Sequence, residues 1–310
     1  MSSLIRGVLL LIIISSTITS CGKLTAADQE QQFTVVSVYE GMDIYVESTR
    51  SNPEADLDDL FRKHVIDAYW KECAEGGEYT LLAEGAFENP IVDLDGLEEE
   101  IESLRNSRIE EIVVEALKQS SALLDGPDTT VCIAALDPEN SFVKEYMNGV
   151  AGRTLGSGKI LIQANLQDDW EDRVSYAIAH EYHHSVWTFL YYERNEGNDL
   201  LNYLVFEGKA DSFARLVYPN IEAPWTDALT TEQEAQQWRK MEPQLSITDY
   251  GVKQRYIFGD GRSVPLWSGY TIGFHIVQSF LQQNPEKTID EWTGMDANEI
   301  LTQSGYTGEP

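Results

Sequence analysis

The sequence predicts an α+β fold that is mostly helical, with a small β-sheet. Three short segments have strand character: Phe33–Tyr39 is rich in Val, Tyr and Thr, and Thr130–Leu136 and Lys159–Ala164 are apolar runs. Longer segments repeat their apolar residues at helical spacing. One of these begins at Trp170 and continues through Ile178–Trp187, which contains three of the five histidines of the chain.

The composition indicates a globular chain with a strongly acidic surface. The chain has 310 residues, of which 42% are hydrophobic, and this is enough to bury a core for one large domain or two smaller ones. Its 22 Lys and Arg residues stand against 52 Asp and Glu residues, which gives a net charge of −30. Phosphate binding needs a cationic surface, so this charge argues against a nucleic-acid partner.

The N-terminus predicts export from the cytoplasm. One charge, Arg6, precedes the apolar run Val8–Ile14, which is too short to span a bilayer and is typical of a signal peptide, expected over residues 1–20. The next stretch, Ile18–Gly22, resembles the lipobox of bacterial lipoproteins. The resemblance implies that Cys21 becomes the new N-terminus and carries lipid such as palmitate, with residues 21–32 as a lipidated tether.

A plain secretory signal with an incidental cysteine is the alternative interpretation of this N-terminus. Under both interpretations the mature protein lies outside the cytoplasm. With the lipid, we expect it at the bacterial cell membrane or cell surface, attached through the N-terminal anchor only.

Residues 33–125 are expected to form a mainly helical portion ahead of a larger domain at residues 126–310. Asp56–Cys73 places apolar residues at helical spacing and should end near Gly76. Leu97–Leu124 has the same period, with Asp95 as a plausible cap. No internal repeat or low-complexity linker suggests a further division.

Cys73 and Cys132 are the other two cysteines of the chain. An exported location permits a disulfide between them. Two buried free thiols are an equally good interpretation, because the sequence does not give their distance.

The segment Ile178–Trp187 contains His180-Glu181-Tyr182-His183-His184 within a predicted helix. Residues four apart lie on one face of a helix, so His180 and His184 can direct ring nitrogens at one ion. Glu181 would lie beside that ion. This H-E-x-x-H pattern is typical of Zn²⁺ sites in which the glutamate accepts a proton from a water on the metal.

A catalytic zinc needs a third protein ligand, and a second helical segment, Leu204–Ala214, offers one. Glu207 and Asp211 are four residues apart and can both face the first helix. Glu207 can bind the ion, and Asp211 can accept the second N–H of a ligand histidine. Both carboxylates are bracketed by apolar residues, where an unpaired charge would cost free energy. This argues against the alternative that they are ordinary charges on a helix surface.

The pattern His180-Glu181-x-x-His184 followed by Glu207-x-x-x-Asp211 resembles the gluzincin type of zinc metallopeptidase. The region from Gly149 to Ala214, with Trp267–Gly273, is also similar to an uncharacterised bacterial family of predicted zinc-dependent proteases. The resemblance covers about the C-terminal half of the chain.

This resemblance implies a zincin-like fold, with a small sheet packed on the active-site helix and Ile160–Ile162 as the edge strand that faces a polypeptide substrate. It also implies that His180, His184 and Glu207 bind the metal, with Glu181 as general base and Asp211 as partner of a ligand histidine. His183 has no place in the pattern and is expected to serve packing or hydrogen bonding.

Peptide hydrolysis also needs a donor for the oxyanion that forms at the scissile carbonyl. Tyr270 is the first choice, because it lies at the start of a predicted helix in the aromatic, glycine-spaced segment Trp267–Phe280. His275 lies in the same segment. A packing role is the alternative for both residues.

The sequence therefore predicts an extracytoplasmic, lipid-anchored zinc metallopeptidase that acts on polypeptides. One alternative is a zinc-stabilised binding lipoprotein without activity, in which a fourth protein ligand such as His183 would close the site. Another is an amidase on cell-wall amides, which would use the same ligands.

Overall fold

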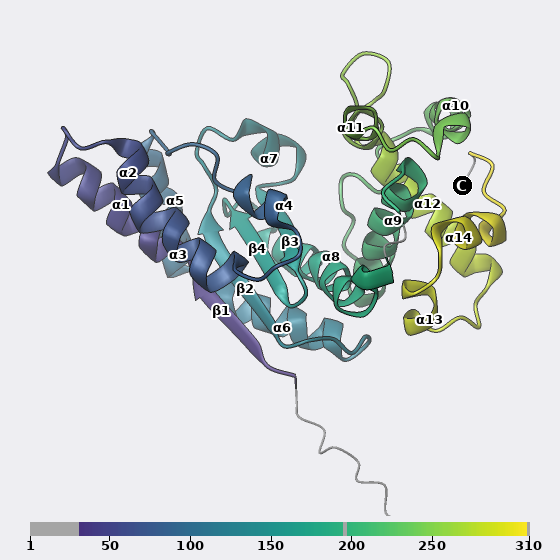
Figure 1. The fold of residues 1–310 in the computed structure, drawn as a ribbon, viewed down its shortest axis with the longest axis horizontal. Helices are drawn as coiled ribbons and strands as arrows, with labels where there is room; N and C mark the ends of the chain where they lie inside the picture. The colour runs from purple at the N-terminus through teal and green to yellow at the C-terminus, as the bar shows by residue number, and fades with distance from the viewer. Residues whose placement is uncertain (1–30, 195–196, 309–310) are drawn as a thin grey trace, which may run out of the picture. The chain divides into compact units, whose positions relative to one another are not determined.

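The computed structural model describes residues 31–194 and 197–308 and contains one four-stranded sheet surrounded by helices (Figure 1). The strand order is β1-β2-β4-β3. β1, β2 and β4 are parallel, and β3 runs antiparallel to β4. The strands are β1 (Phe33–Ser37), β2 (Thr129–Ala135), β3 (Val150–Gly156) and β4 (Lys159–Ala164).

Most of the N-terminal helices lie on one face of this sheet, and α6 (Ile109–Ser121) and α8 (Trp170–Tyr191) lie against each other on the other face (Figure 1). β2 and β4 are buried almost throughout, as expected for strands with both faces covered. The N-terminal helical elements are α1 (Tyr39–Ser51), α2 (Leu57–Phe61), η1 (Arg62–Ile66), α3 (Asp67–Tyr69), η2 (Trp70–Ala74), α4 (Thr80–Glu84), α5 (Leu94–Asn106) and α6 (Ile109–Ser121).

The second half of the chain is mostly helical, and its longest helix, α8, packs directly on β3 and β4. α9 lies against α8, and α12 lies against α9 (Figure 1). The helices of this half are α7 (Ser141–Tyr146), α8 (Trp170–Tyr191), η3 (Tyr192–Arg194), α9 (Leu200–Val217), α10 (Thr231–Met241), η4 (Glu242–Gln244), α11 (Tyr250–Phe258), α12 (Ser268–Gln283), α13 (Ile289–Thr293) and α14 (Ala297–Ser304).

The predicted fold class, mostly helical α+β with a small sheet packed on the motif helix, is confirmed. One hydrophobic core runs from α1 through the sheet and α8 to α14. Residues 33–125 contribute β1 to the sheet, so the expected N-terminal portion and the domain at 126–310 share one sheet within the compact unit Gln31–Pro310. The division between them stays a prediction.

The prediction that Ile160–Ile162 forms the edge of the sheet is wrong. These residues lie in β4, which has β2 on one side and β3 on the other. The edge strand is β3, which the sequence presents as a glycine-punctuated segment without a clear strand pattern. Gly152 of β3 carries no side chain because the side chain of Glu181 occupies that space: an added Cβ would lie 2.6 Å from Glu181 Cγ.

Two details of the N-terminal helices also differ from expectation. The helical run Leu97–Leu124 is interrupted at Ser107, where the backbone is extended, so α5 and α6 are separate helices. The cap of α5 is Asp93, whose carboxylate accepts the N–H of Gly96, and not Asp95.

Cys73 of η2 and Cys132 of β2 form a disulfide with their Cα atoms 6.1 Å apart. Both residues are buried, so the bond ties the N-terminal helices to the middle of the sheet. This decides between the two alternatives that the sequence leaves open.

The predicted signal peptide, the lipidated Cys21 and most of the tether lie outside the described residues. Within residues 31–194 and 197–308, no helix has both the length and the apolar character needed to cross a bilayer.

Candidate metal centre

Two histidines of α8 and a glutamate of α9 converge on one point. Nε2 of His180 lies 3.0 Å from Nε2 of His184, and Oε2 of Glu207 lies 3.3 and 3.4 Å from these two nitrogens. All three side chains are buried. The structure therefore brings the three predicted ligands together in a group that could hold a metal ion.

The centre forms because two adjacent helices present one face each. His180 and His184 are one turn apart on α8, and Glu207 comes from the stretch of α9 that packs on α8. Both helices are buried along these stretches, so only a small part of each of these side chains is exposed.

Asp211 lies one turn after Glu207 and holds the ring of His180. Its Oδ1 is 3.0 Å from His180 Nδ1. An ionised carboxylate only accepts hydrogen bonds, so Nδ1 is the donor, and neutral His180 carries its free lone pair on Nε2, the atom that faces His184 and Glu207. This is the arrangement expected for Asp211.

His184 is held by packing. Its ring stacks on Phe206, with centroids 4.0 Å apart and an interplanar angle of 20°. Its Nδ1 is buried and has no hydrogen-bond partner among the described residues. The two histidines that point into the centre are thus oriented by different means.

His183 points away from the centre. Its Nε2 is 3.2 Å from the hydroxyl of Thr293, and its ring stacks on Trp292. Burial and the neighbouring His184 lower the pKa of His183 well below its usual value. It serves packing and hydrogen bonding, as expected, and within the described residues no fourth His, Cys, Asp or Glu joins the group of three.

Glu181 lies beside the centre, between α8 and the edge strand β3. The hydroxyl of Thr154 donates to its carboxylate at 2.8 Å and contacts its backbone oxygen at 2.9 Å. An added Cβ at Gly152 would lie 2.7 Å from Glu181 Oε1, so the carboxylate rests directly on the strand. This places a proton-accepting oxygen at the sheet edge.

The charges of the centre perturb its titratable groups. Burial raises the pKa of Glu207, but the charge on His184 and hydrogen bonds from both histidines outweigh burial and lower this pKa to about 2. Burial also lowers the pKa of His180, and the charge and hydrogen bond of Asp211 outweigh it, so the pKa of His180 is raised well above its usual value. Coupled groups of this kind are typical of functional sites.

Tyr270, at the start of α12, lies among aromatic rings next to the centre. Its ring contacts those of Trp225, Phe258 and Trp267 at centroid distances of 5.5 to 6.1 Å. Burial raises the pKa of Tyr270 well above its usual value, and the charge of Glu207 contributes in the same direction. His275, by contrast, bonds to Glu234 of α10 at 2.8 Å.

Tyr203 is a second phenol near the centre, and the metal-binding pattern does not include it. It lies one turn before Glu207 on α9, so both point to the same side of that helix. Burial raises the pKa of Tyr203, and the charge of Glu207 raises it further. The four-residue spacing from Glu207 was a signal that could have identified it.

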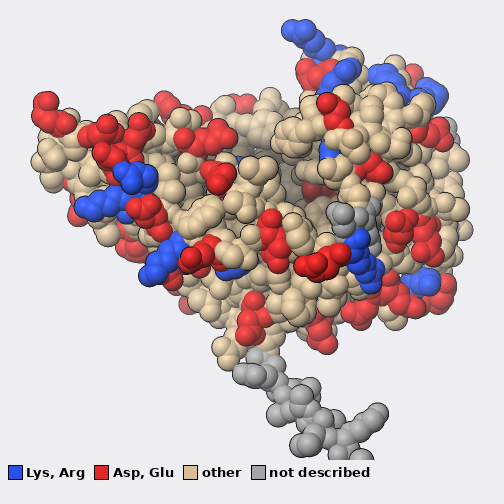
Figure 2. Space-filling model, in the orientation of Figure 1, with Lys and Arg blue, Asp and Glu red and all other residues tan. Residues whose placement is uncertain are grey.

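Figure 2 shows the surface hollowed between the side that carries α4 and α7 and the side that carries α11, with acidic side chains spread over the surrounding surface. The two sides are joined by rings: Phe142 of α7 contacts Trp267 at a centroid distance of 5.5 Å.

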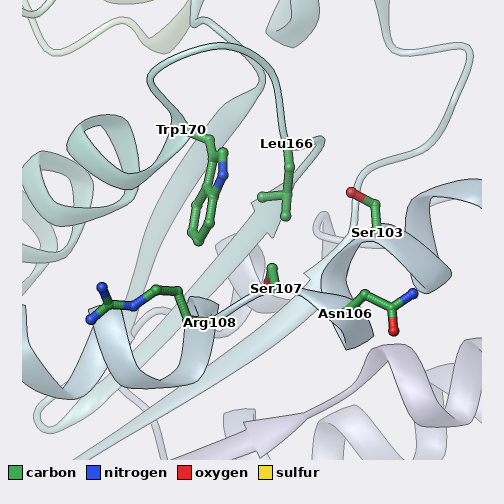
Figure 3. A pocket seen from close by; sticks show the side chains of 6 residues that line it. All are labelled: Ser103, Asn106, Ser107, Arg108, Leu166 and Trp170. Atoms are coloured by element: carbon green, nitrogen blue, oxygen red, sulfur yellow. The ribbon is translucent and has the colours of Figure 1, made fainter.

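A separate surface pocket of about 610 Å³ lies between the α5–α6 junction and the start of α8 (Figure 3). Its lining residues are Ser103, Asn106, Ser107, Arg108, Leu166 and Trp170. None of the predicted site residues lines it.

The description of the family that this chain matches agrees with a zinc site. The model of the family described as "Predicted Zn-dependent protease (DUF2268)" matches residues 109–302. The chain is 33% identical over 144 residues to the uncharacterized protein YjfC of Bacillus subtilis (strain 168). The matched region covers 43% of this chain and 48% of YjfC.

The chain is also 26% identical over 168 residues to the uncharacterized protein YjaZ of the same organism. This matched region covers 53% of the chain and 63% of YjaZ. The chain thus spans about half to three fifths of the length of these curated relatives. No solved structure matches.

Proposed function

Because this chain belongs to the DUF2268 family of predicted Zn-dependent proteases, we propose that it is a zinc-dependent metallopeptidase that hydrolyses polypeptides outside the cytoplasm. The observation that carries this proposal is the convergence of His180, His184 and Glu207 on one point. Glu181 directly follows His180 on α8, and its carboxylate rests on β3.

The donor atoms fit zinc. With metal–ligand bonds of about 2.0–2.2 Å, a tetrahedral site places ligand atoms about 3.3–3.6 Å apart. The observed separations are 3.0, 3.3 and 3.4 Å. In their neutral forms the two imidazoles, together with the carboxylate of Glu207, offer lone pairs to one point, and nitrogen and oxygen donors of this kind are ligands of Zn²⁺.

Three protein ligands leave the fourth position for water, which is typical of catalytic zinc, whereas structural zinc has four protein ligands. The engagement of His183 with Thr293 therefore favours an enzyme over a zinc-stabilised binding protein.

The side chains around the centre support the following reaction. Zn²⁺ held here would polarise the scissile carbonyl and lower the pKa of a water. Glu181 accepts the proton of that water at its carboxylate and passes it to the leaving amine. Tyr270 donates its phenolic hydrogen to the developing oxyanion. Asp211 keeps the hydrogen of His180 on Nδ1.

A substrate in extended conformation would add to β3, the edge strand against which Glu181 lies. Main-chain hydrogen bonds to β3 would give the peptide its register, and the scissile carbonyl would lie beside Glu181. One end of this edge is already covered, because Tyr79 donates its N–H to the carbonyl of Leu155.

We place the protein outside the cytoplasm, anchored at the bacterial membrane by lipid on Cys21. The signal-like N-terminus supports this location, and so does the Cys73–Cys132 disulfide, because such bonds persist in oxidising compartments. Labelled palmitate should enter the parent but not Cys21→Ser, and equal labelling of both would contradict the anchor.

The test of the activity is Glu181→Gln, assayed with a peptide library. The variant should keep one equivalent of zinc and lose turnover, because the amide cannot accept the proton. Glu171→Gln is the matched control, since Glu171 is an exposed glutamate on the same helix. Parent-like turnover in Glu181→Gln at equal zinc content would refute the role, and cleavage of cell-wall amides instead of peptides would redirect the proposal to an amidase.

A further inference from the structure

We propose that Trp225 is a positioning residue of the metal centre: its indole N–H holds Asp211, and through Asp211 it orients His180. This inference rests on the proposed function, because it takes His180 as a metal ligand. Trp225 lies between α9 and α10, in a segment without regular structure, and nothing in the sequence pattern marks it.

Three donors converge on a single oxygen of Asp211. Nε1 of Trp225 donates to Oδ1 at 2.9 Å, and the hydroxyl of Tyr176 donates to the same oxygen at 3.1 Å. Nδ1 of His180 lies 3.0 Å from it. The other oxygen, Oδ2, is buried and has no hydrogen-bond partner among the described residues. The negative charge of Asp211 is therefore directed to the oxygen that His180 contacts.

This arrangement fixes the carboxylate, because Asp211 is 0% exposed and water cannot replace a lost donor cheaply. Without the hydrogen bond from Trp225, Oδ1 would accept fewer hydrogen bonds and would differ less from Oδ2 in this respect. The carboxylate could then rotate away from Nδ1 of His180. Hydrogen bonds to a buried charge are among the stronger ones in proteins.

The backbone of Trp225 is also held by a hydrogen bond. The hydroxyl of Thr271 on α12 donates to the carbonyl of Trp225 at 2.8 Å and accepts the N–H of Ala228 at 3.3 Å. Thr271 follows Tyr270, so one turn of α12 supports both the proposed oxyanion donor and the residue that holds Asp211.

The ring of Trp225, whose N–H donates to Asp211, also contacts the aromatic rings near the hollow. Its centroid lies 5.8 Å from that of Trp267 and 6.1 Å from that of Tyr270. A change in the packing of these rings can therefore shift Trp225, and through Asp211 it can change the orientation of His180.

The experiment measures the affinity for zinc by chelator competition in the full chain. Trp225→Phe keeps an aromatic ring but loses the N–H, and Tyr176→Phe removes the second donor. Each should bind zinc about tenfold more weakly than the parent, the lower end of the effect of outer partners of a ligand histidine. Trp238→Phe, which alters a buried tryptophan of α10, should bind like the parent.

Two further readouts separate positioning from general packing. The visible absorption spectrum of the Co²⁺-loaded protein should change in Trp225→Phe and not in Trp238→Phe, because it reports the ligand geometry. In an Asp211→Asn background, Trp225→Phe should cause no additional loss of zinc affinity, because its effect passes through Asp211.

A Trp225→Phe variant with the affinity and spectrum of the parent would overturn the inference, and so would a loss that simply adds to that of Asp211→Asn. If Trp225→Phe does not fold, Trp225→Tyr tests the same point, because its ring also lacks the indole N–H and the same zinc affinity and spectrum are expected to change. A parent that binds no zinc would instead refute the proposed function, so the two failures are distinguishable.

Discussion

At the scale of the residue, the centre depends on side chains that the sequence pattern does not contain. The helical spacing predicted that His180 and His184 share a face, and that Glu207 and Asp211 share another. It could not predict that Phe206 stacks on His184 or that Thr154 donates to Glu181, because these contacts depend on how helices and strands meet.

Gly152 gives the clearest prediction at this scale. In Gly152→Ala the new Cβ would lie 2.6 Å from Cγ of Glu181, so the carboxylate must move. Turnover should fall about 100-fold, the usual cost of misplacing a catalytic group by about 1 Å, while zinc remains at one equivalent. The measurement is kcat together with metal content.

Gly251→Ala is the matched control, because the nearest side-chain oxygen to its added Cβ is at an ordinary 3.5 Å. It should keep the turnover of the parent. If Gly152→Ala also retained full turnover, the position assigned to Glu181 would be incorrect.

At the scale of the element, long periodic helices were predictable and the edge strand was not. α8 and α9 follow from apolar periodicity around their polar residues. β3 was missed because its glycines break the strand pattern, and one of these glycines is needed for contact with Glu181. The position of β4 inside the sheet follows from the presence of β3.

The crossing of α9 and α12 also depends on glycines. An added Cβ at Gly273 would lie 2.1 Å from the carbonyl oxygen of Leu204, and one at Gly208 would lie 2.1 Å from the carbonyl oxygen of Gly273. Both contacts are with backbone oxygens, which cannot move aside as the end of a flexible side chain can. The helix that bears Glu207 therefore packs directly on the helix that bears Tyr270.

We expect Gly273→Ala to lower the free energy of unfolding by about 1–3 kcal/mol, the usual cost of overpacking. Urea denaturation followed by circular dichroism measures this change. Gly251→Ala, in an exposed part of α11, should not lower it. Equal midpoints for Gly273→Ala and the parent would show that the helices can separate at no cost.

At the scale of the whole molecule, the disulfide joins the N-terminal helices to the sheet that supports α8. Cys73 and Cys132 are 59 residues apart in sequence, and closing a loop of this length in the unfolded chain is expected to stabilise the folded state by about 4 kcal/mol. The distance between these cysteines depends on how η2 packs on β2, so their pairing could not be predicted from the sequence.

Replacing both cysteines with alanine should therefore lower the urea midpoint of the metal-free protein substantially. Adding a reductant to the unfolded parent before refolding should give a similar midpoint. If the double variant denatured at the same urea concentration as the oxidised parent, the disulfide would not contribute to stability.

The central claim is that His180, His184 and Glu207 hold one zinc ion. The most direct measurement is anomalous diffraction at the zinc edge from crystals of the zinc-loaded protein. We predict a single strong peak about 2.0–2.2 Å from Nε2 of His180, Nε2 of His184 and an oxygen of Glu207. A fully loaded crystal with its peak elsewhere, or with no bound zinc, would contradict the account.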